Sequence, residues 1–289
     1  MQSFKTIADL RAHLTPLRQR KIASRIAPQI ALVPTMGALH AGHLELVRRA
    51  RKAADHVVVS IFVNPAQFAP HEDFQSYPRD VVRDAQAVAD LKLDNVALFT
   101  PDVAEIYPAA PRTQIELGDI ATRWDGAARP GHFAGVALVV TKLFNIAQPG
   151  IALFGEKDFQ QLQIIRQITR DLSIPVEITG VPTAREASGL ALSSRNAYLS
   201  DEERNIIAPK LHQTLQNAAE QIRAGKDIEQ TLQKAKQDLT AAGFNAPDYF
   251  AYVDSETLTP LSRLSPLASR LLTAARLGKA RLIDNIAVT

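Results

Sequence analysis

The chain has 289 residues, of which 46% are hydrophobic and 22% are charged, a composition typical of globular proteins. It contains no cysteine, which excludes disulfides and thiolate metal sites. No stretch approaches the roughly 18 apolar residues of a membrane span, and the amino-terminal sequence is not typical of a signal peptide. The net charge of +3 is a small excess, and no aromatic–basic repeat accompanies it. We therefore expect a cytoplasmic enzyme with a phosphate-bearing small-molecule ligand, and neither nucleic acid nor membrane as a partner.

Strands and helices alternate over the first two thirds of the sequence. In chain order we expect a strand at Gln29–Thr35, a helix from about His43, a strand at His56–Val63, a helix near Val81–Leu91, a strand near Val96–Thr100, a helix near Gly135–Ala147, a strand at Ile151–Phe154, a helix at Phe159–Asp171 and a strand at Pro175–Thr179. Such alternation is typical of βαβ units. The fold class is therefore α/β, with a doubly wound, Rossmann-like parallel sheet.

The pattern changes beyond about Pro182. A polar loop at Leu190–Leu199 precedes a charged helix at Asp201–Gly225, which opens at Ser200 with Glu203 in the capping-box position. A second helix near Ile228–Ala242, short strands around Tyr249–Val253 and a final run at residues 270–285 then follow. We expect two domains, at residues 1–183 and 184–289, of which the second is smaller and α+β.

The segment Pro34–His43, PTMGALHAGH, joins the first expected strand to the first expected helix. Ligands of open α/β sheets bind at the carboxyl ends of strands, where this segment lies. Gly37 and Gly42 let a ligand approach the backbone closely, and free amides at a helix start favour phosphate. His40 and His43 can both donate hydrogen bonds to phosphoryl oxygens. The segment predicts a phosphate-binding turn rather than an ordinary turn with two surface histidines.

Other kinds of site fit this sequence less well. Neither GxxxxGK[ST] nor GxGxxG occurs, so a P-loop kinase and a dinucleotide dehydrogenase are unsupported. A zinc site is disfavoured because the chain has neither cysteine nor HExxH. If ATP binds, the residues of the HxGH sequence, His40 to His43, must contact it.

The same turn resembles the HxGH nucleotidyltransferase superfamily, which includes class I aminoacyl-tRNA synthetases, and in its longer PTMG form the pantothenate synthetase family. Further segments match that family in order over nearly the whole chain: SIFVNPAQF (60–68), YPRD (77–80), RPGHF (129–133), KLF (142–144), FGEKDFQQ (154–161), LALSSRN (190–196) and ARLIDN (280–285). The ordered set is far more specific than any one motif, because each motif alone also has a purely structural interpretation.

The resemblance implies a two-step ligation. ATP, a substrate, would activate pantoate as pantoyl adenylate with release of pyrophosphate, and the amine of β-alanine would then displace AMP. Mg²⁺ would bridge the phosphates, residues 184–289 would act as a lid over the reaction, and the protein would be a homodimer.

The resemblance also implies a set of site residues. The charge-stabilising, catalytic group would be His40, His43, Lys157, Ser193, Ser194 and Arg195. The residues that bind ATP would be Pro34, Thr35, Met36, Gly37, His40, Gly42, His43, Gly155, Lys157, Asp158, Leu192, Ser193, Ser194 and Arg195. Those that bind pantoate or β-alanine would be Asn64, Gln67, Tyr77, Arg129 and Gln161, the two glutamines holding hydroxyls and carboxylate through donor and acceptor together. Asp158 is the candidate Mg²⁺ ligand.

Three positions depart from the family's pattern. Asp125 stands where glutamate is usual, after an unexpected Trp124, and we expect its shorter side chain to make longer or water-mediated contacts. Ala134 replaces a commoner arginine, and Ser188 stands where an acidic residue is usual.

Two interpretations of the whole sequence compete with this one. Another adenylyltransferase of the superfamily is disfavoured by Gln67, Gln161 and the NPAQF segment, and an RNA-binding protein is disfavoured because no RNA module is recognisable. The charges between Asp73 and Asp84 are interpreted as a solvated face.

Overall fold

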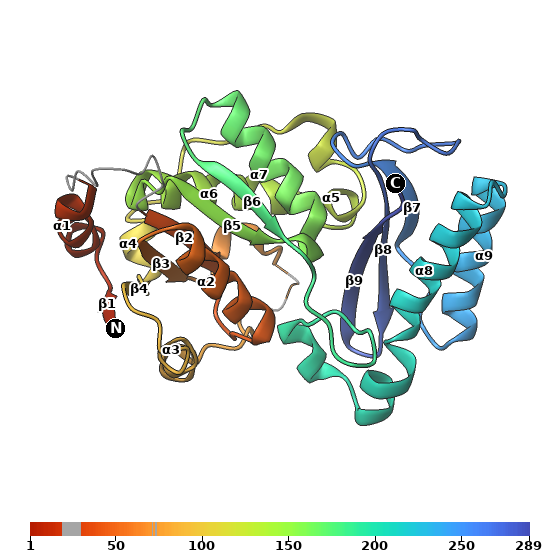
Figure 1. Ribbon diagram of the computed structural model, residues 1–289, viewed down its shortest axis with the longest axis horizontal. Helices are drawn as coiled ribbons and strands as arrows, with labels where there is room; N and C mark the ends of the chain where they lie inside the picture. Colours follow the sequence, from red (N-terminus) through yellow and green to blue (C-terminus); the bar gives the residue numbers. More distant parts are fainter. Residues whose placement is uncertain (19–29, 71, 73) are drawn as a thin grey trace.

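The structure is a computed structural model that describes residues 1–18, 30–70, 72 and 74–289, and it contains two sheets (Figure 1). The larger sheet has six parallel strands in the order β1-β4-β3-β2-β5-β6. They are β1 (Gln2–Phe4), β2 (Ile30–Thr35), β3 (His56–Ile61), β4 (Val96–Phe99), β5 (Ile151–Gly155) and β6 (Glu177–Val181). The prediction of a doubly wound parallel sheet is confirmed.

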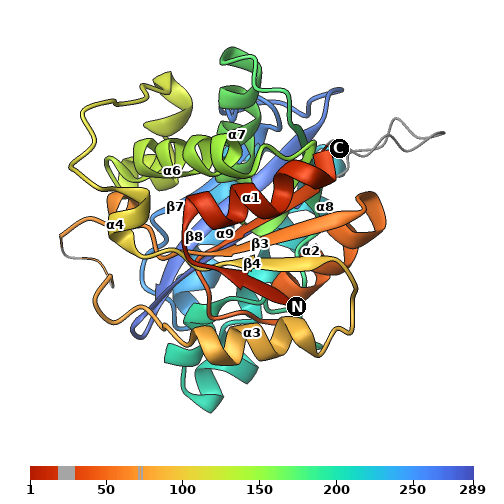
Figure 2. The same cartoon turned by 90° about the vertical axis from the view of Figure 1, so that its left-hand side faces the viewer.

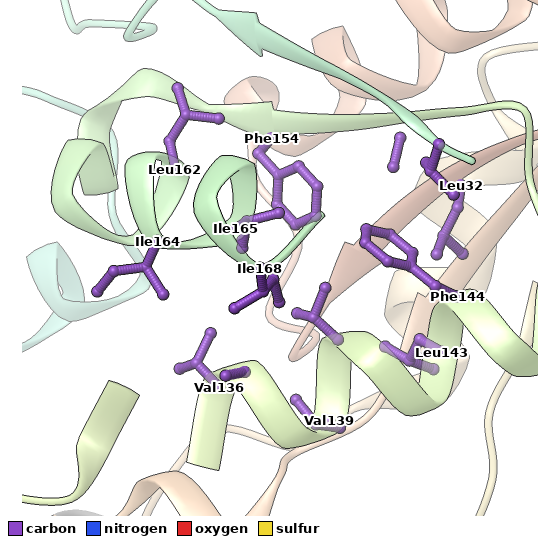
Figure 3. Close-up of a cluster of buried hydrophobic side chains, with 14 of the residues drawn as sticks. Leu32, Val136, Val139, Leu143, Phe144, Phe154, Leu162, Ile164, Ile165 and Ile168 are labelled. Atoms are coloured by element: carbon purple, nitrogen blue, oxygen red, sulfur yellow. The ribbon is translucent and has the colours of Figure 1, made fainter. Parts of the chain in front are cut away.

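Helices cover both faces of this sheet. The helices of the larger sheet are α1 (Ile7–Arg18), α2 (Ala41–Ala53), α3 (Val81–Ala89), α4 (Val103–Ile106), α5 (Asp125–Ala128), α6 (His132–Ala147) and α7 (Phe159–Asp171). One face packs against α1, α6 and α7, and the other against α2 and α3 (Figure 2). Successive residues of β2 alternate between the two cores: Leu32 points to the first and Val33 to the second. Figure 3 shows Leu32 and Phe154 meeting side chains from α6 and α7 in the first core.

The order of the strands fixes where a ligand can bind. From β2 the chain first proceeds to β3 and β4 on one side, and later to β5 and β6 on the other. The crevice of a doubly wound sheet lies at such a reversal, outside the carboxyl ends of the two neighbouring strands between which the order reverses. Here those ends are Thr35 of β2 and Gly155 of β5. The PTMGALHAGH segment (34–43) and the GEKD segment (155–158) begin at these two strand ends and are therefore neighbours.

The smaller sheet is antiparallel and is formed by β7 (Tyr249–Asp254), β8 (Ser269–Leu277) and β9 (Ala280–Ala287). Its outer face packs against α8 (Lys210–Arg223) and α9 (Ile228–Ala241). Its other face contributes Val253 and Leu272 to the core that lies beneath α6 and α7. The smaller sheet is thus joined to the N-terminal part of the protein through apolar side chains of this shared core.

Most expected elements are present within a few residues of their predicted bounds, although Gln29 lies outside the described residues. The long helix expected at Asp201–Gly225 is interrupted, and that prediction was wrong. A π-helix occupies Glu203–Ile207, and α8 begins only after Pro209, which has no N–H to continue a helical ladder. The expected capping box is present, with Ser200 and Glu203 exchanging hydrogen bonds of 2.8 and 3.2 Å. No helix in the described part of the chain is long and apolar enough to cross a membrane.

Candidate active site

The turn between β2 and α2 depends on unusual backbone conformations. Gly37 and Ala38 have φ values of 87° and 50°. Thr35 Oγ1 accepts the Gly37 N–H at 3.2 Å and donates to the carbonyl of Ser60 at 2.7 Å. A Cβ atom at Gly37 would lie 2.9 Å from the carboxylate of Asp84. Glycine is therefore needed at this position for both its conformation and its lack of a side chain.

Both histidines of the turn are oriented by backbone amides. His40 is the N-cap of α2, and its Nδ1 accepts the Gly42 N–H at 3.2 Å. The Nδ1 atom of His43 accepts the His40 N–H at 3.3 Å, and the two rings lie with centroids 4.0 Å apart. An imidazole that accepts through Nδ1 and is neutral carries its proton on Nε2. Each ring therefore offers an Nε2–H donor to a ligand.

The electrostatic environment keeps these rings neutral. Burial and then the charge of Lys157 lower the pKa of His40 to about 4. Burial and then the neighbouring ring of His40 lower the pKa of His43 to about 3. At neutral pH both are uncharged hydrogen-bond donors.

Asp84 holds the turn from outside. It lies on α3 with only 2% exposure, and its two carboxylate oxygens accept the N–H groups of Ala38 and Leu39 at 2.9 and 2.8 Å. The interpretation of this carboxylate as part of a solvated face was wrong, and Asp73 lies outside the described residues. Asp84 is the first buried residue of helix α3. Its spacing of four residues from Val88, which places both on one face of the helix, was the only sequence signal that it is buried.

The GEKD turn faces the histidines from the end of β5. Lys157 is mostly buried, with 18% of its side chain exposed, and its Nζ lies 4.0 Å from Asp158 Oδ1. The side-chain amide of Asn285, on β9, donates to the carbonyls of Glu156 and Lys157 at 2.9 Å each. This turn is therefore held by the last strand of the smaller sheet.

Amide side chains form another wall of the site. Asn64 and Gln67 are buried at the short 3₁₀ helix Pro65–Gln67, and Asn64 Nδ2 donates to Gln67 Oε1 at 3.1 Å. The Nε2 atom of Gln67 lies 3.1 Å from the sulfur of Met36, which links this wall to the HxGH turn. Gln161, in the first turn of α7, borders the same space.

The SSRN loop, residues 193–196, borders the site from the C-terminal side. Ser193 Oγ accepts the Arg195 N–H at 3.3 Å, and Asn196 Nδ2 donates to the carbonyl of Ala191 at 3.1 Å. The hydroxyls of Tyr77 and Ser194 are 3.4 Å apart, so the YPRD segment touches this loop. The structure thus brings both segments to one place.

A buried ion pair supports the loop and was not found from the sequence. Asp284, with 4% exposure, binds both guanidinium nitrogens of Arg185 at 2.6 and 2.9 Å. The same guanidinium donates to the carbonyl of Gly189 at 3.1 Å. Asp284 belongs to the ARLIDN segment, so that segment supports the SSRN loop as well as the GEKD turn.

Arg129 makes protein contacts on every side of its guanidinium group. It binds Glu72 at 2.6 and 2.8 Å, and it also contacts His132 Nε2 at 2.9 Å. Burial alone would raise the pKa of Glu72, but the hydrogen bond and charge of Arg129 outweigh it and lower that pKa to about 2. The geometry therefore favours a supporting role for Arg129 over the predicted contact with substrate.

Asp125 makes a direct contact rather than the long or water-mediated one expected from the sequence. Its Oδ1 lies 2.6 Å from Arg281 Nη2, and Arg281 Nε lies 2.7 Å from Asp248. Trp124 Nε1 donates to the carbonyl of Leu258 at 3.0 Å. The expectation was wrong because Arg281, from β9, reaches across to the shorter carboxylate.

The predicted residues surround one cavity of about 220 Å³. All of them line it except Gly37 and Arg129: Pro34, Thr35, Met36, His40, Gly42, His43, Asn64, Gln67, Tyr77, Gly155, Lys157, Asp158, Gln161, Leu192, Ser193, Ser194 and Arg195. A larger cleft of about 1020 Å³, bordered by Arg129, shares Lys157 and Arg195 with it. Gly37 is buried beneath the turn that it shapes.

A metal ion held by protein side chains alone has little support. No group of three or more His, Asp or Glu side chains suited to a metal occurs among residues 1–18, 30–70, 72 and 74–289. Asp158 offers a single carboxylate, half exposed, on the cavity wall. Such a site suits a cation that takes its other ligands from a phosphate-bearing substrate and water.

Comparison with known proteins agrees with this geometry. The family model described as pantoate-beta-alanine ligase matches residues 2–287. The chain belongs to this family. Among curated relatives, the pantothenate synthetase of Rhizorhabdus wittichii is 54% identical over 100% of this chain and 99% of its own. That of Sphingopyxis alaskensis is 51% identical over 100% of both chains.

Solved structures of the same family show the same fold. The pantothenate synthetase of Thermus thermophilus has a TM-score of 0.89 at 45% identity and covers 100% of this chain and 99% of its own. The pantoate–β-alanine ligase of Francisella tularensis, solved in complex with "Beta-gamma ATP" and β-alanine, has a TM-score of 0.80 at 34% identity, over 100% and 98% of the two chains.

Proposed function

We propose that this protein joins pantoate to β-alanine at the expense of ATP, through a pantoyl-adenylate intermediate. One observation carries the proposal: two neutral imidazole donors and an ammonium group border the same cavity as two amide side chains. The first set suits phosphates, and the second suits a small polar acid. The relatives named as ligases of pantoate and β-alanine, one of them solved with both "Beta-gamma ATP" and β-alanine, support these substrates.

In the first step, a carboxylate oxygen of pantoate attacks the α-phosphorus of ATP, and the bond to the departing pyrophosphate breaks. Charge builds on the phosphoryl oxygens, so fixed donors aimed at them lower the barrier. We assign this task to the Nε2–H groups of His40 and His43, with Lys157 neutralising the phosphates. Ser193, Ser194 and Arg195 would then stabilise the departing pyrophosphate.

In the second step, the free amine of β-alanine attacks the acyl carbon, the bond from that carbon to the AMP oxygen breaks, and the amine gives up a proton. The task of the protein here is to hold the acyl group in place. We assign this task to Gln67 and Gln161, which border the cavity beside the phosphate-binding residues. Tyr77 borders the cavity too, whereas Arg129 would act through Glu72 and His132.

We assign the remaining ATP contacts to the backbone and apolar parts of the cavity. Pro34, Thr35, Met36 and Gly42 border it from the HxGH turn, and Gly155 and Leu192 border it from the opposite segments. Gly37 would contribute through the shape of the turn. Asp158 would hold Mg²⁺ together with the phosphates, and the cation would neutralise phosphate charge when bound.

The proposal extends to the organisation of the protein. Residues 1–183 would form the ATP- and pantoate-binding domain, and residues 184–289 the lid that shields the adenylate from water. The contacts of Asn285 and Arg185 with site segments support this division. A homodimer working in the cytoplasm completes the proposal by analogy with the family.

Isotope exchange tests the substrate directly. With pantoate present and β-alanine absent, ³²P-pyrophosphate should exchange into ATP, because the first step is reversible. Omitting pantoate, or replacing it with another small hydroxy acid, should abolish the exchange. Exchange that is equally fast without pantoate, or that needs a different acid, would show that another adenylyltransferase activity is present.

A further inference from the structure

The amide orientation of Asn64 is fixed by the backbone around it. The N–H of Ala66 donates to Asn64 Oδ1 at 3.3 Å, and the carbonyl of Gly135 accepts from Asn64 Nδ2 at 3.1 Å. A backbone N–H can only donate and a carbonyl can only accept, so the oxygen and nitrogen of this amide cannot be exchanged. Asn64 is only 1% exposed, so a reversed amide would leave these backbone groups facing a like group in a buried place.

The orientation of Gln67 follows from that of Asn64. Asn64 Nδ2 carries only hydrogens to donate, and the atom of Gln67 that meets it at 3.1 Å must therefore be Oε1. The Nε2 atom is turned the other way, towards the sulfur of Met36 at the cavity wall. Gln67 thus turns its N–H donors towards the cavity, while its Oε1 atom accepts from Asn64 within the protein.

Tyr107 completes the arrangement from the end of helix α4. Its hydroxyl lies 2.9 Å from Asn64 Oδ1, which is an acceptor, so the tyrosine donates. The ring packs beside Phe62 and beneath the ammonium group of Lys142. Tyr107 does not border the 220 Å³ cavity, and its hydroxyl is connected to the cavity through the two amides.

The hydrogen-bonded amides of Asn64 and Gln67 lie where helix α6 packs tightly against the backbone of residues 65–67. A Cβ atom at Gly135 would lie 2.1 Å from the carbonyl oxygen of Ala66 and 2.8 Å from the Cα of Gln67. Helix α6 therefore lies so close to the backbone of residues 65–67 that no side chain fits at Gly135. This contact fixes where Gln67 stands, while Asn64 and Tyr107 fix which way its amide faces.

We propose that Tyr107 and Asn64 are positioning residues that make Gln67 a hydrogen-bond donor only, so that it binds substrate oxygens through their lone pairs and does not bind donor groups. The inference rests on the proposed function and refines it, because an amide was expected to offer donor and acceptor together. Pantoate meets the requirement through its carboxylate and hydroxyl oxygens. The hydroxyl of Tyr107, which does not touch substrate, should therefore affect pantoate and leave ATP unaffected.

Removal of that hydroxyl tests the positioning role. In the exchange reaction, Tyr107→Phe should raise the KM of pantoate about fivefold and lower kcat severalfold, while the KM of ATP changes less than about twofold. Tyr252→Phe is the matched control, because its hydroxyl is also buried and bound, to Ser269 at 2.9 Å, in the smaller sheet. An equal effect of the two variants, or an equal rise in both KM values, would overturn the role of Tyr107.

A second variant tests the donor itself. Gln67→Glu keeps an oxygen that can accept from Asn64 but turns a second oxygen, not an N–H group, towards the cavity. Pantoate binding should weaken by more than about tenfold, since two acceptors then face each other. Pantoate binding as tight as in the wild type would show that Gln67 does not act as a donor.

A spectroscopic measurement separates failure of this inference from failure of the proposed function. In ¹⁵N-labelled protein without ligands, the side-chain amide hydrogens of Asn64 should exchange slowly with solvent, and faster in Tyr107→Phe. Unchanged exchange in that variant would show that Tyr107 does not fix the amide of Asn64, even in an enzyme that uses pantoate. A wild type that shows no pantoate dependence would overturn the proposed function, whereas slow exchange of the Asn64 amide in that protein would still support the amide arrangement.

Discussion

Two turns of this protein perform neighbouring tasks but are held in different ways. The HxGH turn is secured by hydrogen bonds from the same half of the parallel sheet. Thr35 of β2 links the turn to Ser60 of β3, and Asp84 of α3 accepts two of its backbone N–H groups. The GEKD turn is secured by Asn285 of β9, which lies 128 positions away from Lys157 along the chain. Arg270 of β8 adds a contact of 3.4 Å with Glu156 and stacks on the ring of Phe159.

The difference shows how the site is assembled. The imidazole donors follow directly on a strand of the parallel sheet, and the hydrogen bonds from Thr35, Ser60 and Asp84 that hold their turn come from the first 84 residues of the chain. The turn that carries the ammonium group of Lys157 is held by hydrogen bonds from β8 and β9 of the smaller sheet. Damage to the HxGH support should therefore act on the phosphoryl step itself, whereas damage to the C-terminal strands should act through the position of Lys157.

The largest effect is expected for Asp84→Asn. An amide group would set a donor against one of the two N–H groups that the carboxylate accepts, leaving a buried pair unsatisfied. A small displacement of the turn is expected to lower kcat on the order of 10²-fold. Steady-state kinetics with Asp80→Asn as the control would sharpen the comparison, because Asp80 also accepts a backbone N–H on α3 but caps an exposed helix end. Equal kinetics for the two variants would break it.

A smaller effect is expected for Asn285→Asp. The new carboxylate cannot donate to the carbonyls of Glu156 and Lys157, and it would repel them. Because Lys157 then moves relative to the phosphates, kcat/KM for ATP should fall about tenfold, or about 1.4 kcal/mol. Asn217→Asp, on the exposed face of α8, should leave kcat/KM unchanged. A loss confined to pantoate would mean that Asn285 does not act through Lys157.

A still smaller effect is expected for Asp125→Glu, which lengthens a side chain that already touches Arg281. The guanidinium is held on its other side by Asp248, so the pair must shift to admit a methylene group. Thermal unfolding should occur a few degrees lower, since about 1 kcal/mol corresponds to about 2–4 °C in a protein near this size. We expect kcat within about threefold of the wild type. A loss beyond about tenfold, or about 1.4 kcal/mol, would instead place the pair in the catalytic step.

The smallest effect concerns pH. His40 and His43 have pKa values lowered to about 4 and about 3, mainly by burial, so they stay neutral from about pH 8 down to about pH 5. The kcat/KM of the free enzyme should show no decline near pH 6.5 that belongs to them. Between the unfolded value of 6.5 and the folded values, the unfolded chain binds more protons, so stability should fall as pH falls through that window. A decline in kcat/KM centred near the ordinary histidine pKa would show that at least one imidazole is charged during catalysis.

The sequence predicted the turns better than their supports. Motifs of adjacent residues located His40, His43 and Lys157, because the carboxyl end of a strand and the start of a helix can be recognised locally. Asp84 and Arg185 were not found, since each acts through a partner far along the chain and no spacing rule connects them. The same limit explains Asp125, whose contact with Arg281 depends on how the smaller sheet is docked.

Amide orientation could not be predicted for a related reason. A glutamine in a motif can donate or accept, and only the groups around it decide which. For Gln67 those groups are Asn64, the backbone of Gly135 and the hydroxyl of Tyr107, from three separate elements. The helix break before α8 follows from Pro209, a local signal that the charged pattern of the segment outweighed.

The central claim is that the HxGH histidines act on the phosphoryl step, and assaying the two half-reactions of His43→Ala tests it most directly. Formation of pantoyl adenylate from ATP should slow by on the order of 10²–10³-fold, because a donor to the developing charge is lost. The same variant, given pre-made pantoyl adenylate and β-alanine, should keep most of its activity, and His13→Ala on α1 should be unaffected in both assays. Equal loss in the two half-reactions of His43→Ala would contradict the account.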